Sequence, residues 1–288
     1  MGWRHENGAN FKKDGRRIYI YMREIVANRH LIWKLAKNDF KKRYAGSSLG
    51  AVWAMIQPVI TVLMYWFVFQ GIMNQKYQSI AEGVNVPYVL FLTAGLVPWF
   101  FFSEALNNGT ASLLEYQYLV KKVVFNINIL PVVRVTAALF IHVFFALVLL
   151  VVSLLYGYHP SLYMLQIVYY SFGLFVFALG LSYITSAIVV FFRDLTQIIS
   201  IGLQLGMWAT PVLWDISMAN NWSPVIASII KLNPVCYIVT GYRNAIYGGQ
   251  WFWERPGYTI YFWVVSLGLL WLGRKLFDKL KFHFADVL

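Results

Sequence analysis

Residues 129–157 read ILPVVRVTAALFIHVFFALVLLVVSLLYG, and Arg134 and His142 are the ionisable side chains in this run. The run is longer than the roughly 20 helical residues that cross a hydrocarbon core. The whole chain is similar, because 59% of its 288 residues are hydrophobic, 12% are charged and the mean hydropathy is +0.58. Soluble proteins carry about 25% charged residues. The sequence therefore predicts a chain that crosses a membrane several times.

Six apolar segments alternate with charged clusters, and each should be helical because lipid satisfies no backbone amide. The expected fold class is all-α, a polytopic membrane protein with six transmembrane helices. The expected spans are 49–73, 88–113, 129–157, 163–192, 195–213 and 257–272. They divide the chain into an N-terminal region (1–48), a membrane domain (49–273) and a tail (274–288).

Glycine and proline are expected to interrupt two of these spans. The residues concerned are Gly95, Pro98 and Gly109 in the second span and Gly202, Gly206 and Pro211 in the fifth. Breaks are tolerated where protein or water satisfies the freed backbone groups. Ordinary kinking explains the same residues equally well.

The segment 216–256, between the fifth and sixth spans, is too apolar for an ordinary loop. Its runs 225–230 and 235–246 are split by Asn233 and Pro234, and neither run is long enough to span. A re-entrant or interfacial helical hairpin is predicted here. The tryptophans around it fit an interfacial aromatic belt; they are Trp208, Trp214, Trp222, Trp251 and Trp253.

The Lys and Arg residues are distributed unequally between the two sides of the predicted membrane domain. One side holds 20 of the 24, and the other holds Lys76, Lys231, Arg243 and Arg255. The basic side should face the cytoplasm, which makes both termini cytoplasmic and the hairpin external. This bias, together with anionic headgroups, explains the net charge of +12. Nucleic-acid binding is not expected.

Residues 28–44 have the pattern of an amphipathic helix. The apolar positions at helical spacing are Leu31, Ile32, Leu35, Ala36, Phe40 and Tyr44. The basic positions are Lys34, Lys37, Lys41, Lys42 and Arg43. Such a helix lies on the inner leaflet. It serves as an anchor, or it frames an entrance for a lipid-attached substrate.

The sequence lacks the motifs of most enzymes. Cys236 is the single cysteine, and the five histidines have no metal-ligand spacing, so no metal site is expected. No phosphate-binding GxxxxGK[ST] loop or DxD pair occurs. The ionisable residues Glu104, Arg134 and His142 are few for an ion-coupled carrier, and Glu104 equally suits a hydrogen bond between helices. A secondary carrier and a membrane-embedded transferase remain as alternatives.

Several short blocks, in order over residues 29–288, resemble the ABC-2 type permeases that export surface polysaccharides. The blocks are 42–44 KRY, 49–50 LG with Trp53 and 57–58 QP, 94–99 AGLVPW, 102–105 FSEA, 119–123 LVKKV, 129–131 ILP, 192–194 FRD, 210–212 TPV, 232–234 LNP, 242–243 YR and 284–288 FADVL. The run 65–69 YWFVF and the long basic N-terminus make the resemblance closest to the teichoic acid exporters.

The resemblance implies that two copies of this chain work with two copies of a separate ABC ATPase. The chain itself would bind no cofactor, and ATP and Mg would be bound by the partner. A cytoplasmic coupling segment, residues 114–125, would contact the ATPase, with Tyr118, Leu119, Lys121 and Lys122 as its contacts. The alternative is a solvated loop anchored by the two lysines.

The resemblance also implies an undecaprenyl-diphosphate-linked polymer as the substrate, flipped or extruded across the cytoplasmic membrane. Wall teichoic acid is expected first, and O-antigen, capsule or a small molecule are the alternatives. The aromatic residues proposed for the path are Tyr65, Trp66, Phe69, Trp99 and Trp208. Aromatic residues that face lipid or the core are the alternative reading. Lys41, Lys42 and Arg43 would attract the diphosphate, or would bind lipid headgroups.

Overall fold

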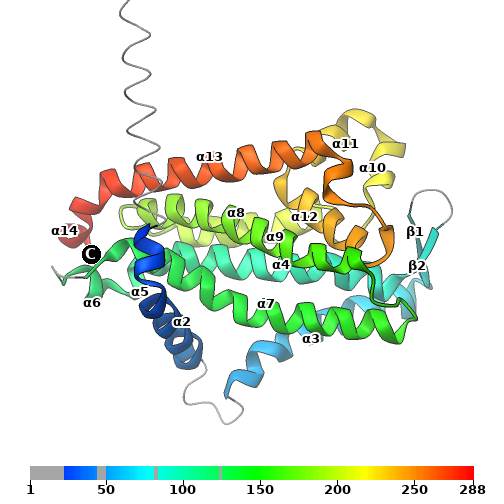
Figure 1. Ribbon diagram of the computed structural model, residues 1–288, viewed down its shortest axis with the longest axis horizontal. Helices are drawn as coiled ribbons and strands as arrows, with labels where there is room; N and C mark the ends of the chain where they lie inside the picture. Colours follow the sequence, from blue (N-terminus) through cyan, green and yellow to red (C-terminus); the bar gives the residue numbers. More distant parts are fainter. Residues whose placement is uncertain (1–22, 44–49, 81–83, 123–124) are drawn as a thin grey trace, which may run out of the picture.

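The computed structural model describes residues 23–43, 50–80, 84–122 and 125–288. Within them the chain is mostly helical, and its long helices run side by side (Figure 1). The long helices are α3 (Trp53–Trp66, continued by a π-helical stretch, Phe67–Ile72), α4 (Tyr88–Thr110), α7 (Leu130–Leu155), α8 (Gln166–Val189), α9 (Leu195–Ala209) and α13 (Pro256–Leu280). The shorter helices are α2 (Arg29–Arg43), α5 (Ser112–Glu115), α6 (Gln117–Val120), α10 (Ile216–Trp222), α11 (Pro224–Lys231), α12 (Pro234–Arg243) and α14 (Phe284–Val287).

Within the described residues, five helices are long and apolar enough to cross a membrane. They are Trp53–Ile72, Tyr88–Thr110, Ile127–Leu155, Leu162–Val189 and Pro256–Val287. These correspond to five of the six expected spans. The start of the first span, 49–53, falls partly outside the described residues.

The fifth expected span, 195–213, is shorter than predicted. Helix α9 has 15 residues, which is about 22 Å of helix. It ends at Ala209 because Pro211 disfavours helical dihedrals in the preceding residue, and Thr210 is extended with φ −88° and ψ 142°. The turn that follows is buried.

The expected interruption of the second span is wrong, because α4 continues as one helix through Pro98. Gly95 instead allows a close contact between α4 and the turn after α9. A Cβ atom at this position would lie 2.5 Å from the carbonyl oxygen of Val212. The missing side chain therefore lets the turn after α9 pack directly against α4.

Two strands, β1 (Tyr77–Ile80) and β2 (Val84–Pro87), form a small antiparallel hairpin between α3 and α4. Tyr77 pairs with Pro87 and Ile80 pairs with Val84. The all-α prediction is wrong in this detail. Valine at two positions of β2 favours an extended strand.

Helices α4 and α8 form the buried centre of the bundle, and α7, α9, α12 and α13 pack around them. Helices α8 and α13 approach closely, because a Cβ at Gly273 would lie 2.6 Å from the carbonyl oxygen of Gly180. Helix α3 differs, since Ala54 is its one buried residue among those described. Many of its apolar side chains are exposed, as expected for a surface in lipid.

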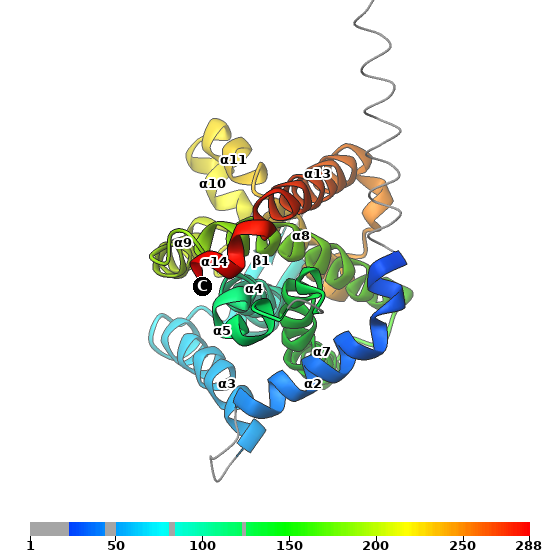
Figure 2. The same ribbon diagram turned by 90° about the vertical axis from the view of Figure 1, so that its left-hand side faces the viewer.

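Helix α2 runs across the direction of the long helices (Figure 1). It lies at the end of the bundle that also holds α5, α6 and the C-terminus, and it crosses beneath α7 in the end view (Figure 2). The predicted helix at 28–44 is thus present as Arg29–Arg43, while Tyr44 lies outside the described residues. Ile32 and Ala36 are buried, and the Trp33 ring packs edge-on against Phe140 at 5.0 Å.

The predicted hairpin at 216–256 divides into two parts. Helices α10 and α11 project from the end opposite α2 (Figure 1). Helix α12 is bent from α11 by 93° and is buried against α4, α8 and α13. The second arm is therefore a core element, because both faces of α12 contact other helices.

Candidate functional site

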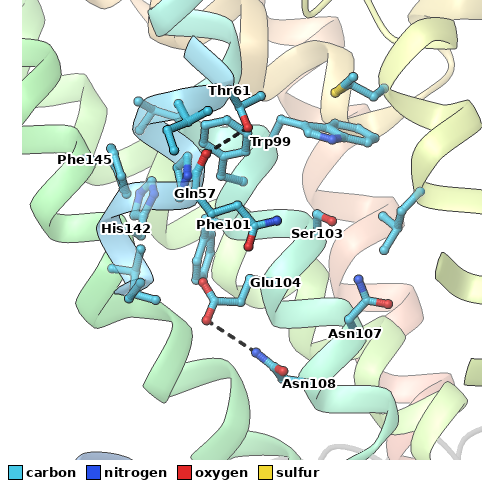
Figure 3. Close-up of a pocket in the computed structure, with 18 of the residues that line it drawn as sticks. Gln57, Thr61, Trp99, Phe101, Ser103, Glu104, Asn107, Asn108, His142 and Phe145 are labelled. Carbon is cyan, nitrogen blue, oxygen red and sulfur yellow. Dashed lines mark hydrogen bonds between the residues drawn. The ribbon is translucent and has the colours of Figure 1, made fainter. Parts of the chain in front are cut away.

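A cavity of about 1150 Å³ lies between α3, α4, α7 and α9 (Figure 3), and Arg43 of α2 is also one of its lining residues. Its side chains come from segments that are distant in the sequence. They include Gln57 and Thr61 of α3; Trp99, Ser103, Glu104, Asn107 and Asn108 of α4; His142 and Phe145 of α7; and Ser200, Gln204, Met207 and Trp208 of α9.

Amides and hydroxyls form a polar strip along the cavity. On α4 the strip recurs every three to four residues, which keeps its side chains on one helix face. Ser200 of α9 donates a hydrogen bond to Asn107 Oδ1 at 3.1 Å. Thr61 of α3 donates to the Gln57 carbonyl at 2.9 Å (Figure 3). The strip thus offers uncharged donors and acceptors from three helices.

Aromatic rings form the rest of the wall. Trp99 is 5% exposed, and its ring lies against α9, since a Cβ at Gly206 would come within 3.1 Å of it. Trp208 is 57% exposed and lines the same cavity. The structure therefore brings together two of the five aromatic residues expected along the path.

The other three expected path residues lie outside the lining. Tyr65 Oη is 4.0 Å from Sδ of Met207, which does line the cavity. The Phe69 ring packs 5.3 Å from the Tyr88 ring. Trp66 is 40% exposed. Tyr65 thus lies next to the cavity through Met207, Phe69 lies next to Tyr88, and Trp66 is the most exposed of the three.

Charge is scarce in the cavity. Among the described lining residues the charged side chains are Arg43 and Glu104, whose Nη1 and Oε1 atoms are 2.6 Å apart. Lys41 and Lys42 are exposed on the last turn of α2 and do not line the cavity. Of the three basic residues expected at the entrance, Arg43 alone lies in this lining.

A buried ion pair that the sequence did not predict lies beside Arg43. Asp39 and Arg134 are both less than 10% exposed, and Arg134 Nη1 lies 2.9 and 3.0 Å from the two Asp39 oxygens. Asp39 also accepts from Tyr116 Oη at 2.8 Å and contacts Arg43 at 3.4 Å. Arg134 pairs with Glu115 as well. One sequence signal was available, because Asp39 falls at helical spacing from the buried Ile32 and Ala36.

Burial, with the Asp39 carboxylate next to it, raises the pKa of Tyr116. The phenol therefore stays protonated at neutral pH and acts as the donor to Asp39. The Arg134 guanidinium also lies over the Tyr116 ring, 5.0 Å from its centroid. Tyr116 thus links the junction of α5 and α6 to both members of the ion pair.

The predicted coupling segment, 114–125, lies between α4 and α7 at the end of the bundle that holds α2 (Figure 1). Tyr118 is 51% exposed, Lys121 and Lys122 are exposed, and Leu119 is partly buried. Residues 123–124 lie outside the described residues. The four side chains named as ATPase contacts therefore lie on or near one surface, and their role stays a prediction.

A second buried arginine holds the turn after α9. Arg243 of α12 donates to the carbonyl oxygens of Pro211 at 2.7 Å and Val212 at 2.6 Å, and its guanidinium lies 3.6 Å from the Phe91 ring centroid. Asn233 donates to Thr210 Oγ1 at 2.8 Å. Three of the short sequence blocks, TPV, LNP and YR, thus meet in one place.

The chain matches the ABC-2 type transporter family over residues 30–247. It belongs to this family. The match extends from α2 into the π-helical stretch Asn244–Gly248 that follows α12. Every element that lines the cavity is therefore part of the ABC-2 region.

Similar proteins are known from other bacteria. The chain is 31% identical over 265 residues to the O-antigen export system permease protein RfbA of Myxococcus xanthus, an alignment that covers 92% of this chain and 98% of that protein. It is 30% identical over 262 residues to the protein of the same name from Klebsiella pneumoniae, covering 90% and 95%. This ABC-2 protein is thus a multi-pass membrane protein whose relatives are permeases of polysaccharide export.

The described residues of this ABC-2 chain contain no group of three or more His, Cys, Asp or Glu side chains placed to hold a metal ion. Several buried polar side chains contact one another across the core. His142 Nε2, for example, lies 2.9 Å from Tyr242 Oη and 3.0 Å from Ser171 Oγ. These contacts join α7, α8 and α12 across the core.

Proposed function

We propose that this chain is the membrane-spanning subunit of an ATP-driven exporter, and that a lipid-linked polysaccharide of the O-antigen class passes along the cavity between α3, α4 and α9. The observation that carries the proposal is the lining of that cavity. Amides, hydroxyls and aromatic rings offer many weak contacts to a hydroxyl-rich chain, and none of them needs to hold the substrate tightly.

The energy source is a separate ABC ATPase that binds ATP and Mg. The sequence has no phosphate-binding loop, and the relatives are named permease proteins of export systems. The coupling segment provides the docking surface, with two copies of this chain in the complex. The exposed apolar surface of α3 supports a second copy or lipid as the neighbour of this helix.

The basic end of the bundle faces the cytoplasm, so the two termini lie there, in the regions 1–48 and 274–288. The chain crosses the membrane six times, with α9 as the fifth crossing and α11–α12 as a re-entrant pair. Helix α9 is short, but the turn at 210–213 that continues it is buried against protein, which satisfies its backbone.

Wall teichoic acid is the second candidate substrate. A polyol-phosphate chain is a polyanion, and it would be expected to meet cations along its path. Among the described lining residues the single cation is Arg43, and Glu104 lies 2.6 Å from it. This balance favours a neutral glycan.

The test is reconstitution of the chain with its ATPase in proteoliposomes. A lipid-linked neutral glycan should stimulate ATP hydrolysis more than a lipid-linked polyol phosphate. Replacing Asn107 and Gln204 with Leu should lower that stimulation, whereas Ser228→Leu, exposed on α11, should not. If no ATPase co-purifies with the chain or binds to it, the exporter proposal fails and an ion-coupled carrier becomes the better hypothesis.

A further inference from the structure

A continuous series of ion pairs connects the coupling segment to the cavity. Glu115, three residues before Tyr118, pairs with Arg134. Arg134 pairs with Asp39 at 2.9 Å, Asp39 with Arg43 at 3.4 Å, and Arg43 with Glu104 at 2.6 Å. The series begins on the surface expected to meet the ATPase and ends on a side chain that lines the cavity.

The middle of the series is buried and its ends are not. The side chains of Arg134 and Asp39 are 4% and 8% exposed, whereas Glu115 is 56% exposed and Glu104 is 22% exposed. Ion pairs in a low-dielectric interior interact more strongly than exposed ones, and breaking one leaves an uncompensated charge. The buried pair therefore moves as a unit, and its exposed neighbours respond to it.

Asp39 also receives its contacts from three different elements. Arg134 belongs to α7, Tyr116 lies between α5 and α6, and Arg43 is one turn further along α2. A displacement of Tyr116 or Glu115 changes the partners of the Asp39–Arg134 pair. Because α2 is held to the bundle by this pair and by rings packed on α7, the displacement is passed to Arg43 at its end.

We propose that Asp39 and Arg134 are positioning residues that transmit movement of the coupling segment, through α2, to the Arg43–Glu104 pair in the cavity wall. This inference rests on the proposed function, since it needs an ATPase to move the segment. It adds a route by which ATP binding changes the polar lining of the cavity. Contiguous networks of ion pairs are one physical means by which two distant sites are coupled.

The first experiment uses the reconstituted complex with its ATPase. Asp39→Asn keeps the shape of the side chain and a hydrogen bond to Tyr116 but removes the charge. It should leave assembly and basal ATP hydrolysis intact and lower glycan-stimulated hydrolysis about fivefold or more. The matched control is Arg274→Gln, which removes an ion pair with Glu24 (3.2 Å) outside the series. The control should keep its stimulation.

The second experiment tests Arg43, which belongs to the last two pairs of the series. Arg43→Gln should lower stimulation, and Arg43→Lys, which keeps the positive charge between Asp39 and Glu104, should retain most of it. An Arg43→Lys complex stimulated no better than the Arg43→Gln complex would overturn the proposal. So would an Asp39→Asn complex whose basal hydrolysis and thermal stability fall in proportion to its stimulation, as a purely structural pair requires.

A third measurement needs no polymer and so separates this inference from the choice of substrate. Spin labels at Lys42→Cys and Asn108→Cys lie on either side of the Arg43–Glu104 pair. ATP should change the distance between the labels in the complex, and Asp39→Asn should abolish that change while the ATPase stays bound. If ATP does not change the distance between the labels in the complex that keeps Asp39, the relay is overturned. A glycan that fails to stimulate hydrolysis while the distance responds would count against the proposed substrate alone.

Discussion

Arg243 Nη2 lies 2.6 Å from the carbonyl oxygen of Val212, and that oxygen packs where a side chain on residue 95 would otherwise stand. The contact joins α12, the end of α9 and the middle of α4. The C-terminal end of a helix carries partial negative charge, which stabilises a nearby cation. Helix α9, which forms one wall of the cavity, is thus fixed at its C-terminal end by an arginine from another element.

Replacing Arg243 with Gln should destabilise the chain. The carbonyls of Pro211 and Val212 would lose their donor in a buried site, at a cost of about 1–3 kcal/mol for each unsatisfied group. Thermal unfolding in detergent should show a lower midpoint and should be compared with Arg255→Gln, an exposed residue at the same end of the bundle. Equal midpoints for the two variants would contradict the assigned role.

Gly95→Ala should also destabilise, by about 1–3 kcal/mol, because the new methyl group overlaps the Val212 carbonyl and the Arg243 guanidinium. Gly202→Ala, on α9, is the matched control, because a Cβ at that position would meet nothing within 4 Å. Alanine in a helix is preferred to glycine, so the control should be neutral or slightly stabilising. Unfolding midpoints of the purified variants measure the difference, and a stable Gly95→Ala would show that the close approach is not maintained.

Reversing the charges of Lys121 and Lys122 to Glu should weaken binding of the ATPase while membrane insertion stays intact. Co-purification of the two subunits measures the effect. The control is Lys275→Glu with Lys279→Glu, which makes the same change of charge at exposed positions of α13. Normal assembly and transport by the Lys121 and Lys122 variant would argue against segment 114–125 as the coupling element.

Tyr65→Ala with Phe69→Ala should impair polymer passage more than basal ATP hydrolysis. Tyr65 contacts Met207, which lines the cavity, so the change widens the space next to the proposed path. Trp66→Ala, on the exposed side of the same helix, should have little effect. Transport and hydrolysis assays distinguish the cases, and an equal loss of both activities would indicate that Tyr65 and Phe69 serve packing.

Much of the fold could be predicted because apolar length is visible in the sequence. The runs at 129–157 and 163–192 could be interpreted as membrane spans from the thickness of a bilayer alone. The family resemblance was confirmed by the match over residues 30–247. The same length argument could not place α12, since a short buried helix and an external arm have the same composition.

The errors arose where a residue acts through a partner far away in the chain. Gly95 and Pro98 suggested a broken span, yet α4 is continuous and the glycine accommodates a carbonyl from residue 212. Asp39 could not be singled out on the basic helix, because its partner Arg134 lies 95 residues further on. The aromatic residues of the first span were treated as one group, although Trp66 is exposed whereas Tyr65 and Phe69 are partly buried.

The β-hairpin has a mechanical consequence for α3. The hairpin ties the C-terminal end of α3 to the start of α4. Helix α3 itself contributes little to the core. Displacing this helix sideways removes few buried contacts, whereas separating α8 from α13 would break a close glycine-mediated seam. Of the cavity's walls, α3 and α9 bury one described residue each, whereas α4 and α7 bury many. A change in the width of the cavity at these two helices therefore leaves the centre of the bundle intact.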